Sequence, residues 1–231
     1  MYHYEGHLRS SDIIKDMVIG MADGLTVPFA LAAGLSGAVE SSGIIITAGI
    51  AEIAAGSIAM GLGGFLAGKT EVDHYASELK REYEEVEKFP EIEKLEVREI
   101  FAELGLPSHL QHEIAEVIAS DKNKWVNFMM RYELGLEKPH VSRARQSAFT
   151  IGLAYIVGGI IPLSPYFFVD NTIEGLCYSC GITLIALFIF GFLKSRLTGQ
   201  KPLRGAMKVV AIGALAALTA FILAKLVNSH L

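Results

Sequence analysis

A single carboxylate lies inside the first long apolar stretch of the chain. Asp23 is the one charged residue between positions 17 and 39, a stretch long enough to cross a bilayer as a helix. An ionisable side chain at mid-bilayer costs roughly 3 kcal/mol on insertion scales, so an acid there usually serves an ion or proton path. Asp23 therefore points to cation transport, and the alternative is that it caps a helix broken near Gly24 and Pro28.

Other polar side chains share the faces of the first two apolar stretches. On a helix, Asp12, Asp16 and Asp23 fall within about 40° of one another and form an acidic stripe. Asp12 and Asp16 could instead lie among lipid headgroups. In the next stretch, Glu52 and Met60 are eight residues apart on neighbouring parts of one face. This carboxylate and thioether could face the stripe, although Met60 could also serve packing alone.

Five apolar stretches are long enough to span a membrane as helices. They cover residues 17–39, 44–68, 147–169, 173–193 and 205–227. With 52% hydrophobic and 19% charged residues among 231, the chain is expected to be an all-α, multi-pass membrane protein. Residues 1–15 do not read as a cleavable signal peptide. With a net charge of −5, no nucleic-acid partner is expected.

The distribution of basic residues predicts how the chain crosses the membrane. Residues 40–43 and 170–172 carry no Lys or Arg, whereas basic residues precede the first span and follow the fourth. Because cytoplasmic loops collect Lys and Arg, the N-terminus is predicted to face the cytoplasm. The C-terminus is predicted on the opposite side.

A polar insert separates the second and third spans. Residues 69–145 hold 17 of the 25 acidic and 12 of the 20 basic residues. We expect three parts: residues 1–68 with spans one and two, a cytoplasmic metal-binding helical domain over 69–145, and residues 146–231 with the other spans. Helical periodicity continues to residue 88, and further helices are predicted over 91–104, 108–119 and 123–134.

The first helix of the insert separates its charges. One flank carries Glu71, Glu78, Glu82 and Glu85, and the other carries Lys80, Arg81 and Lys88 together with Glu84 and Glu87. A solvated face would interleave the two signs at i, i+4 spacing. A carboxylate flank without cations therefore favours an ion site over a solvated acidic surface.

More carboxylates and two thioethers follow in the insert. Glu93 and Glu96 lie one turn apart, and Met129, Met130 and Glu133 share the turn before the insert ends. Carboxylates with some thioether and no Cys/His cage suit a borderline divalent metal held weakly enough to be released. Fe(II) or Mn(II) fits better than structural zinc.

Two histidine-containing patterns carry less weight. Glu71 and His74 form one ExxH pair, the spacing used in di-iron bundles, but a ferroxidase site needs more than one such pair. His109 and His112 share a face in the third predicted helix of the insert, and a solvated surface accounts for them.

Four longer motifs resemble the vacuolar iron transporter family. They are DMVIGMADGLTVPFALAAGLSGA, TAGIAEIAAGSIAMGLGGFLAGKTE, FMMRYELGLEKP and QSAFTIGLAYIVGGIIPL. The resemblance covers nearly the whole chain. It implies a five-span, homodimeric transporter of divalent iron, driven by proton exchange, with a glutamate-rich cytoplasmic domain that collects metal.

The resemblance also implies site residues. The domain ligands correspond to Glu82, Glu85, Glu93, Glu96 and Glu133, with Met129 and Met130. The membrane path corresponds to Asp23 and Met60 at the dimer interface, with Asp16 and Glu52 nearby. Asp12 occupies a place where related chains can carry Glu.

Together these observations predict a transporter, not an enzyme. Fe(II), with Mn(II) as a second candidate, would leave the cytoplasm for an organelle lumen or the cell exterior while protons return. The membrane would be the cell membrane of a prokaryote or a vacuolar-type membrane of a eukaryote. No catalytic residue and no prosthetic group is expected, because the metal is the cargo. The alternatives are a membrane-anchored ferroxidase and a metal buffer or sensor without flux.

Overall fold

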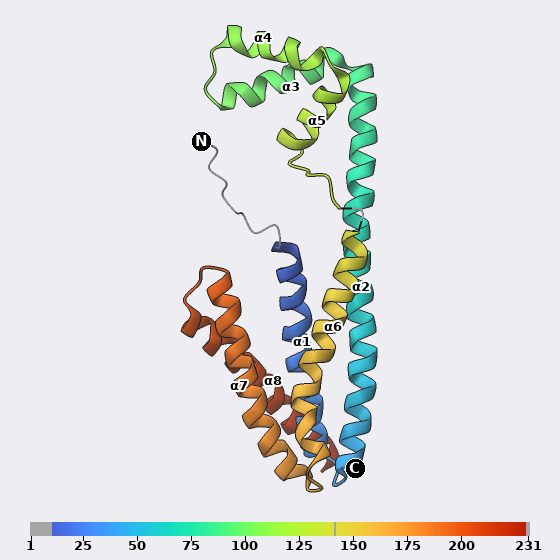
Figure 1. Cartoon of the computed structure of the whole chain (residues 1–231), viewed down its shortest axis with the longest axis vertical. Helices are drawn as coiled ribbons and strands as arrows, with labels where there is room; N and C mark the ends of the chain where they lie inside the picture. Colours follow the sequence, from blue (N-terminus) through green and yellow to red (C-terminus); the bar gives the residue numbers. More distant parts are fainter. Residues whose placement is uncertain (1–10, 141, 230–231) are drawn as a thin grey trace, which may run out of the picture. The chain divides into compact units, whose positions relative to one another are not determined.

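The computed structural model describes residues 11–140 and 142–229, and their regular structure is entirely helical (Figure 1). The helices are α1 (Ser11–Ser36), α2 (Ser42–Lys88), α3 (Pro90–Glu103), α4 (Ser108–Ala119), α5 (Lys122–Tyr132), α6 (Arg143–Leu163), the 3-10 helix η1 (Ser164–Phe167), α7 (Thr172–Leu197) and α8 (Pro202–Asn228).

Five of the described helices are long and apolar enough to cross a membrane, namely α1, α2, α6, α7 and α8. The prediction of an all-α fold with five helices of membrane-spanning length is therefore confirmed for the described residues. The α2 helix has 47 residues and is about 70 Å long at 1.5 Å per residue. Because the hydrocarbon core is about 30 Å thick, α2 must extend well beyond it.

The chain divides into two compact units. The first contains the described residues up to Phe65 and those from Ala144 onward, and the second contains Leu66–Arg143. The α2 helix contributes to both units without a break.

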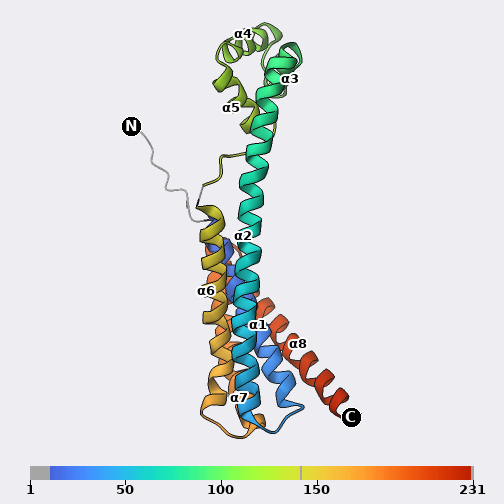
Figure 2. The ribbon, with the colours of Figure 1, turned by 90° about the vertical axis from the view of Figure 1, so that its right-hand side faces the viewer.

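Glycines set the packing of the first unit. In α1, a Cβ at Gly20 or Gly24 would lie 2.3 Å from a backbone oxygen of α6. Gly158 of α6 lies equally close to α1, since a Cβ added there would be 2.9 Å from the carbonyl carbon of Gly24. On the α2 side, Gly56 and Gly64 admit side chains of α6. The α6 helix therefore packs tightly against both α1 and α2, and Figure 2 shows α6 running beside α2.

Replacing Gly24 by Ala is expected to destabilise the first unit. The new methyl group would meet the backbone of Tyr155, and overpacking of this kind costs roughly 1–3 kcal/mol. Gly63→Ala is the matched control, because its Cβ would meet nothing within 4 Å. Thermal unfolding of the detergent-solubilised protein should show a lower midpoint for Gly24→Ala alone. Equal midpoints for the two variants would contradict the close contact.

The second unit has its own apolar core. Its buried members are Val86, Val97, Ala115, Trp125, Val126, Met129 and Met130. Pro90 begins α3, and the Asp121 side chain caps α5 by accepting hydrogen bonds from the backbone of Asn123 and Lys124. The helices predicted over 91–104, 108–119 and 123–134 are present, with ends within two residues of those predicted.

Candidate metal site and membrane acids

Three glutamates from three helices meet in the second unit. Glu82 lies on α2, Glu93 on α3, and Glu133 caps the C-terminal end of α5. One carboxylate oxygen of each lies within 4.8 Å of the other two. The side chains of Glu82 and Glu93 are buried, at 1% and 5% exposure, and Glu133 is exposed. We call these three residues the glutamate cluster.

Helix periodicity explains why the cluster forms. Each of its members lies four residues from a buried core residue on its own helix: Val86, Val97 and Met129. Residues four apart share a helix face, so the apolar packing that joins the three helices also brings the carboxylates together. Oε2 of Glu82 and Oε2 of Glu93 are buried and receive no hydrogen bond from the described residues.

Burial and mutual repulsion raise the pKa values of these carboxyl groups above their usual range. Burial first, then the charges of neighbouring glutamates, raises the pKa of Glu82 and of Glu93 to about 7. The pKa values of Glu133 and Glu96 are also raised, again by burial first and then by other glutamates. Near neutral pH the carboxyl groups of Glu82 and Glu93 are therefore only partly ionised, and a bound cation would favour their charged form.

A cation lies beside the glutamate cluster, on the flank of α2 that was predicted to have none. Arg81 lies 3.2 Å from Glu78 and 3.4 Å from Glu85, and the two glutamates raise its pKa. The prediction of a carboxylate flank without cations is therefore wrong, because a long arginine side chain reaches back over the α2 surface. Arg81 does not neutralise Glu82, whose pKa stays raised despite it.

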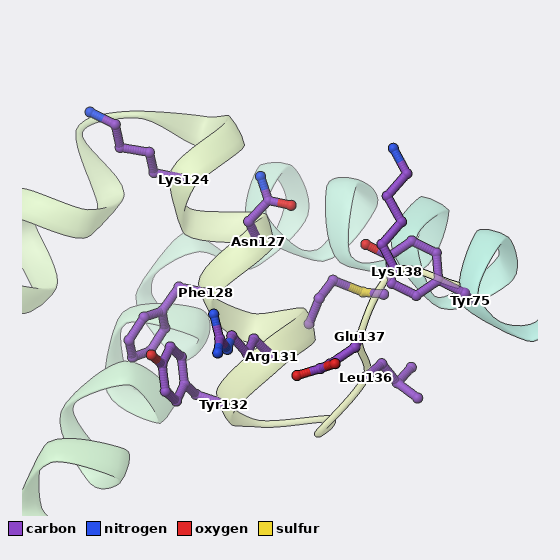
Figure 3. Close-up of a pocket in the computed structure, with 10 residues that line it drawn as sticks. Tyr75, Lys124, Asn127, Phe128, Arg131, Tyr132, Leu136, Glu137 and Lys138 are labelled. Atoms are coloured by element: carbon purple, nitrogen blue, oxygen red, sulfur yellow. The ribbon is translucent and has the colours of Figure 1, made fainter. Parts of the chain in front are cut away.

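The other predicted ligands of the insert are distributed around the cluster. Glu85 and Glu96 are half-buried and interact electrostatically with Glu93. Met129 and Met130 are buried in the apolar core of the unit, at 0% and 1% exposure. Met130 also lines a pocket of about 640 Å³ whose wall carries Lys124, Arg131 and Lys138 (Figure 3). Of the seven predicted ligands, the structure therefore brings the carboxylate oxygens of three close enough together to share an ion.

The histidine patterns lie elsewhere. Oε2 of Glu71 is 3.9 Å from Nε of Arg143, and Nδ1 of His74 is 3.9 Å from Oε1 of Glu78. The ring of His112 forms a 2.7 Å hydrogen bond with the Arg98 side chain, which ties α4 to α3. In the described part of the chain, the one group of three or more metal-ligating side chains close enough to share an ion is the glutamate cluster.

A second polar site lies inside the spans of the first unit. The Tyr155 hydroxyl of α6 donates a hydrogen bond to Oε1 of Glu52 in α2. Oε2 of Glu52 is buried and receives no hydrogen bond from the described residues. Gly56, one turn along α2, leaves room for the tyrosine ring, since a Cβ there would lie 2.5 Å from the Tyr155 hydroxyl.

Asp23 of α1 belongs to the same region. It is half-buried, it precedes Gly24, which contacts the Tyr155 backbone, and it interacts electrostatically with Tyr155. Three spanning helices thus bring two carboxylates and a phenol together. Sequence reasoning missed Tyr155. The usable signal was a phenol in an apolar span, because a buried tyrosine hydroxyl usually has a hydrogen-bond partner.

The other residues predicted to line the membrane path differ in their exposure to solvent. Asp16 is buried, at 3% exposure. Asp12 is exposed, and its carboxylate lies 3.4 Å from Nζ of Lys15. Met60 is half-buried on α2, two turns beyond Glu52.

Replacing Tyr155 by Phe is expected to destabilise the first unit. The change leaves a carboxylate oxygen of Glu52 without its donor, and an unsatisfied buried acceptor costs roughly 1–3 kcal/mol. Tyr178→Phe is the matched control, because Tyr178 is 54% exposed on α7. Thermal unfolding of the two detergent-solubilised variants measures this effect. Identical values for both variants would show that the Tyr155 hydroxyl has no role.

Five membrane-length helices, three of which bring polar groups together, define a multi-pass membrane protein. Comparison with known proteins gives the family. The family model described as "VIT family" matches residues 14–225, and the chain belongs to this family. The resemblance found in the sequence motifs is therefore confirmed.

Curated relatives match over nearly the whole chain. Vacuolar iron transporter 1 of Arabidopsis thaliana is 54% identical over 227 residues, which cover 98% of this chain and 91% of the relative. Vacuolar iron transporter 2 of Oryza sativa subsp. japonica is 48% identical over 227 residues, covering 98% and 92%. Protein CCC1 of Saccharomyces cerevisiae is 38% identical over 235 residues, covering 96% and 72%.

Proposed function

We propose that this protein carries Fe(II), with Mn(II) as a second cargo, out of the cytoplasm across a vacuolar-type membrane in exchange for protons. The observation that carries this proposal is the meeting of Asp23, Glu52 and Tyr155 within the spans of α1, α2 and α6. Acids at such depth are costly and mark ion paths. The names of the relatives, which are vacuolar iron transporters, support iron as the cargo.

In this proposal the second unit faces the cytoplasm and collects the metal. The glutamate cluster offers oxygen ligands from three helices, and its raised pKa values mean that protons and metal compete for the same oxygens. Metal binding therefore releases protons, and its affinity falls as the pH falls. Such a site takes up metal at cytoplasmic pH and exchanges it readily.

Asp23 and Glu52 would couple the export of metal to the return of protons. A metal ion reaching Asp23 and Glu52 displaces any proton they hold, and a proton arriving from the acidic side displaces the metal. Met60 and Asp16 would complete the path, with Asp12 at its entrance. We further propose that two copies of the chain associate, with Asp23 and Met60 at the interface.

Transport by reconstituted protein tests this function. Purified protein in liposomes with an acidic interior should accumulate Fe(II) under anaerobic conditions, and the interior should lose protons at the same time. Liposomes without protein are the control. Metal binding without accumulation would favour a buffer or sensor, and oxygen consumption on aerobic addition of Fe(II) would favour a ferroxidase. Either result would overturn the proposal.

A further inference from the structure

A basic pocket lies in the first unit where α7 ends and α8 begins. It has a volume of about 430 Å³ and is lined by four cationic side chains, those of Lys194, Lys201, Arg204 and Lys208. No carboxylate lines it, and within the described part of the chain none of the four cations has an acidic oxygen within 4 Å. Most exposed lysines of the second unit, by contrast, are paired with glutamate or aspartate.

The turn between the two helices gathers these charges. Gly199 has φ of +68° and ends α7, after which the Gln200 backbone N–H donates to the Ser195 carbonyl oxygen at 2.8 Å. Glycine accepts this left-handed backbone without strain. A Cβ at Gly205 would lie 1.7 Å from Oγ of Ser195, so the first turn of α8 lies directly against the last turn of α7.

Two further groups in the pocket suit an anion. Ser195 is only 6% exposed, and its hydroxyl has no hydrogen-bond partner among the described residues. The α8 helix begins with Pro202, and Lys201 before it supplies no side-chain cap. Pro202 has no backbone N–H and the N–H of Gly205 donates to the Lys201 carbonyl oxygen, so the N–H groups of Leu203 and Arg204 are the ones available at this helix start. Helix N-termini favour phosphate groups.

The pocket adjoins an apolar one. Lys194 also lines a pocket of about 450 Å³ formed mainly by apolar side chains of α1 and α7, among them Met21, Leu25 and Phe190. Free phosphate would need only the basic part, whereas a lipid has both a charged headgroup and acyl chains. Basic pockets between membrane helices are typical sites for anionic headgroups.

We propose that the turn between α7 and α8 binds the phosphate-bearing headgroup of an anionic membrane lipid, with an acyl chain along the adjoining apolar pocket. The turn follows the fourth candidate span, and four crossings put it on the same membrane face as the beginning of α1. Under the proposed orientation this is the cytoplasmic face, where anionic lipids give the surface its negative potential.

Lipid-dependent thermal unfolding of the full-length protein in detergent tests this site. Dioctanoyl phosphatidylinositol 4-phosphate should raise the unfolding midpoint in a saturable manner, and dioctanoyl phosphatidylcholine should not. The triple variant Lys201→Gln, Arg204→Gln, Lys208→Gln should bind the anionic lipid on the order of 100-fold more weakly, since each cation near the membrane surface contributes a factor of roughly five. The double variant Lys201→Arg, Lys208→Arg, which keeps the charge, should bind like the unmodified protein.

A matched control removes three cations elsewhere. Lys80→Gln, Lys88→Gln, Lys122→Gln makes the same change in net charge on exposed positions of the second unit and should leave lipid binding unchanged. Equal loss in the control and the pocket variant would show a general charge effect and overturn the proposal. Stabilisation by inositol 4-phosphate or inorganic phosphate at the same concentrations would assign the pocket to a soluble anion and also overturn it.

Discussion

Replacing Asp23 by Asn is expected to reduce metal uptake into liposomes to the level of liposomes without protein. The amide keeps the shape of the side chain but removes the charge, so a divalent ion crossing the span loses one of the two carboxylates that can replace its hydration shell. Asp23 is half-buried beside the contact between Gly24 and Tyr155, and a neutral side chain there should not disturb the packing. The unfolding midpoint should therefore stay the same or rise.

The control for this variant is Glu174→Gln. Glu174 is exposed in the first turn of α7, so the change removes the same charge from another spanning helix. Uptake should be normal in this control. Normal uptake by Asp23→Asn as well would exclude Asp23 from the path and remove the observation on which the proposed function rests.

Replacing Glu82 and Glu93 together by Gln is expected to weaken Mn(II) binding to the full-length protein by about 100-fold or more, comparable with the strongest effects of changing groups around metal sites. Mn(II) is a convenient probe because it stays divalent in air, and calorimetric titration measures its affinity. Glu103→Gln with Glu113→Gln is the matched control, since both positions are exposed and carry the same charge. Unchanged affinity in the Glu82 and Glu93 variant would show that the metal binds elsewhere.

The same double variant should also change how stability depends on pH. A carboxyl group whose pKa rises on folding contributes stability below its unfolded value, and this contribution is lost as the pH rises through the folded value. Because Glu82 and Glu93 have pKa values of about 7, the metal-free second unit should be less stable at pH 8 than at pH 6, by about 3 kcal/mol at most.

Tryptophan fluorescence can follow this effect in the second unit. Trp125 is the single tryptophan of the chain and lies in the core of that unit at 5% exposure. Unfolding curves at pH 6 and pH 8 should differ for the unmodified protein and differ much less for the Glu82 and Glu93 variant. A pH difference that persists in the variant would place its origin in other groups.

The sequence sufficed for the elements that depend on local patterns. Apolar runs of membrane length specified α1, α6, α7 and α8, and Pro90 and Gly105 marked the breaks around α3, because these signals act through the backbone of a few neighbouring residues. Contacts between distant residues were harder. The pairing of Arg81 with Glu78 and Glu85 depends on how a flexible side chain extends, which helix periodicity does not fix.

The candidate site was predictable only in part. Glu82, Glu93 and Glu133 lie on separate helices, and their meeting follows from the packing of a core that periodicity alone does not assemble. The family resemblance named all three but could not single them out from Glu85 and Glu96. Tyr155 was missed because an aromatic residue in an apolar span is most often a packing residue, and only the position of Glu52 gives its hydroxyl a partner.

The close contact between α1 and α6 has a mechanical consequence. At Gly20, Gly24 and Gly158 the two helices meet backbone to backbone, so no layer of side chains separates them that could repack as one helix slides past the other. Closely packed surfaces of this kind resist continuous deformation. We therefore expect α1 and α6 to move as one rigid body during transport.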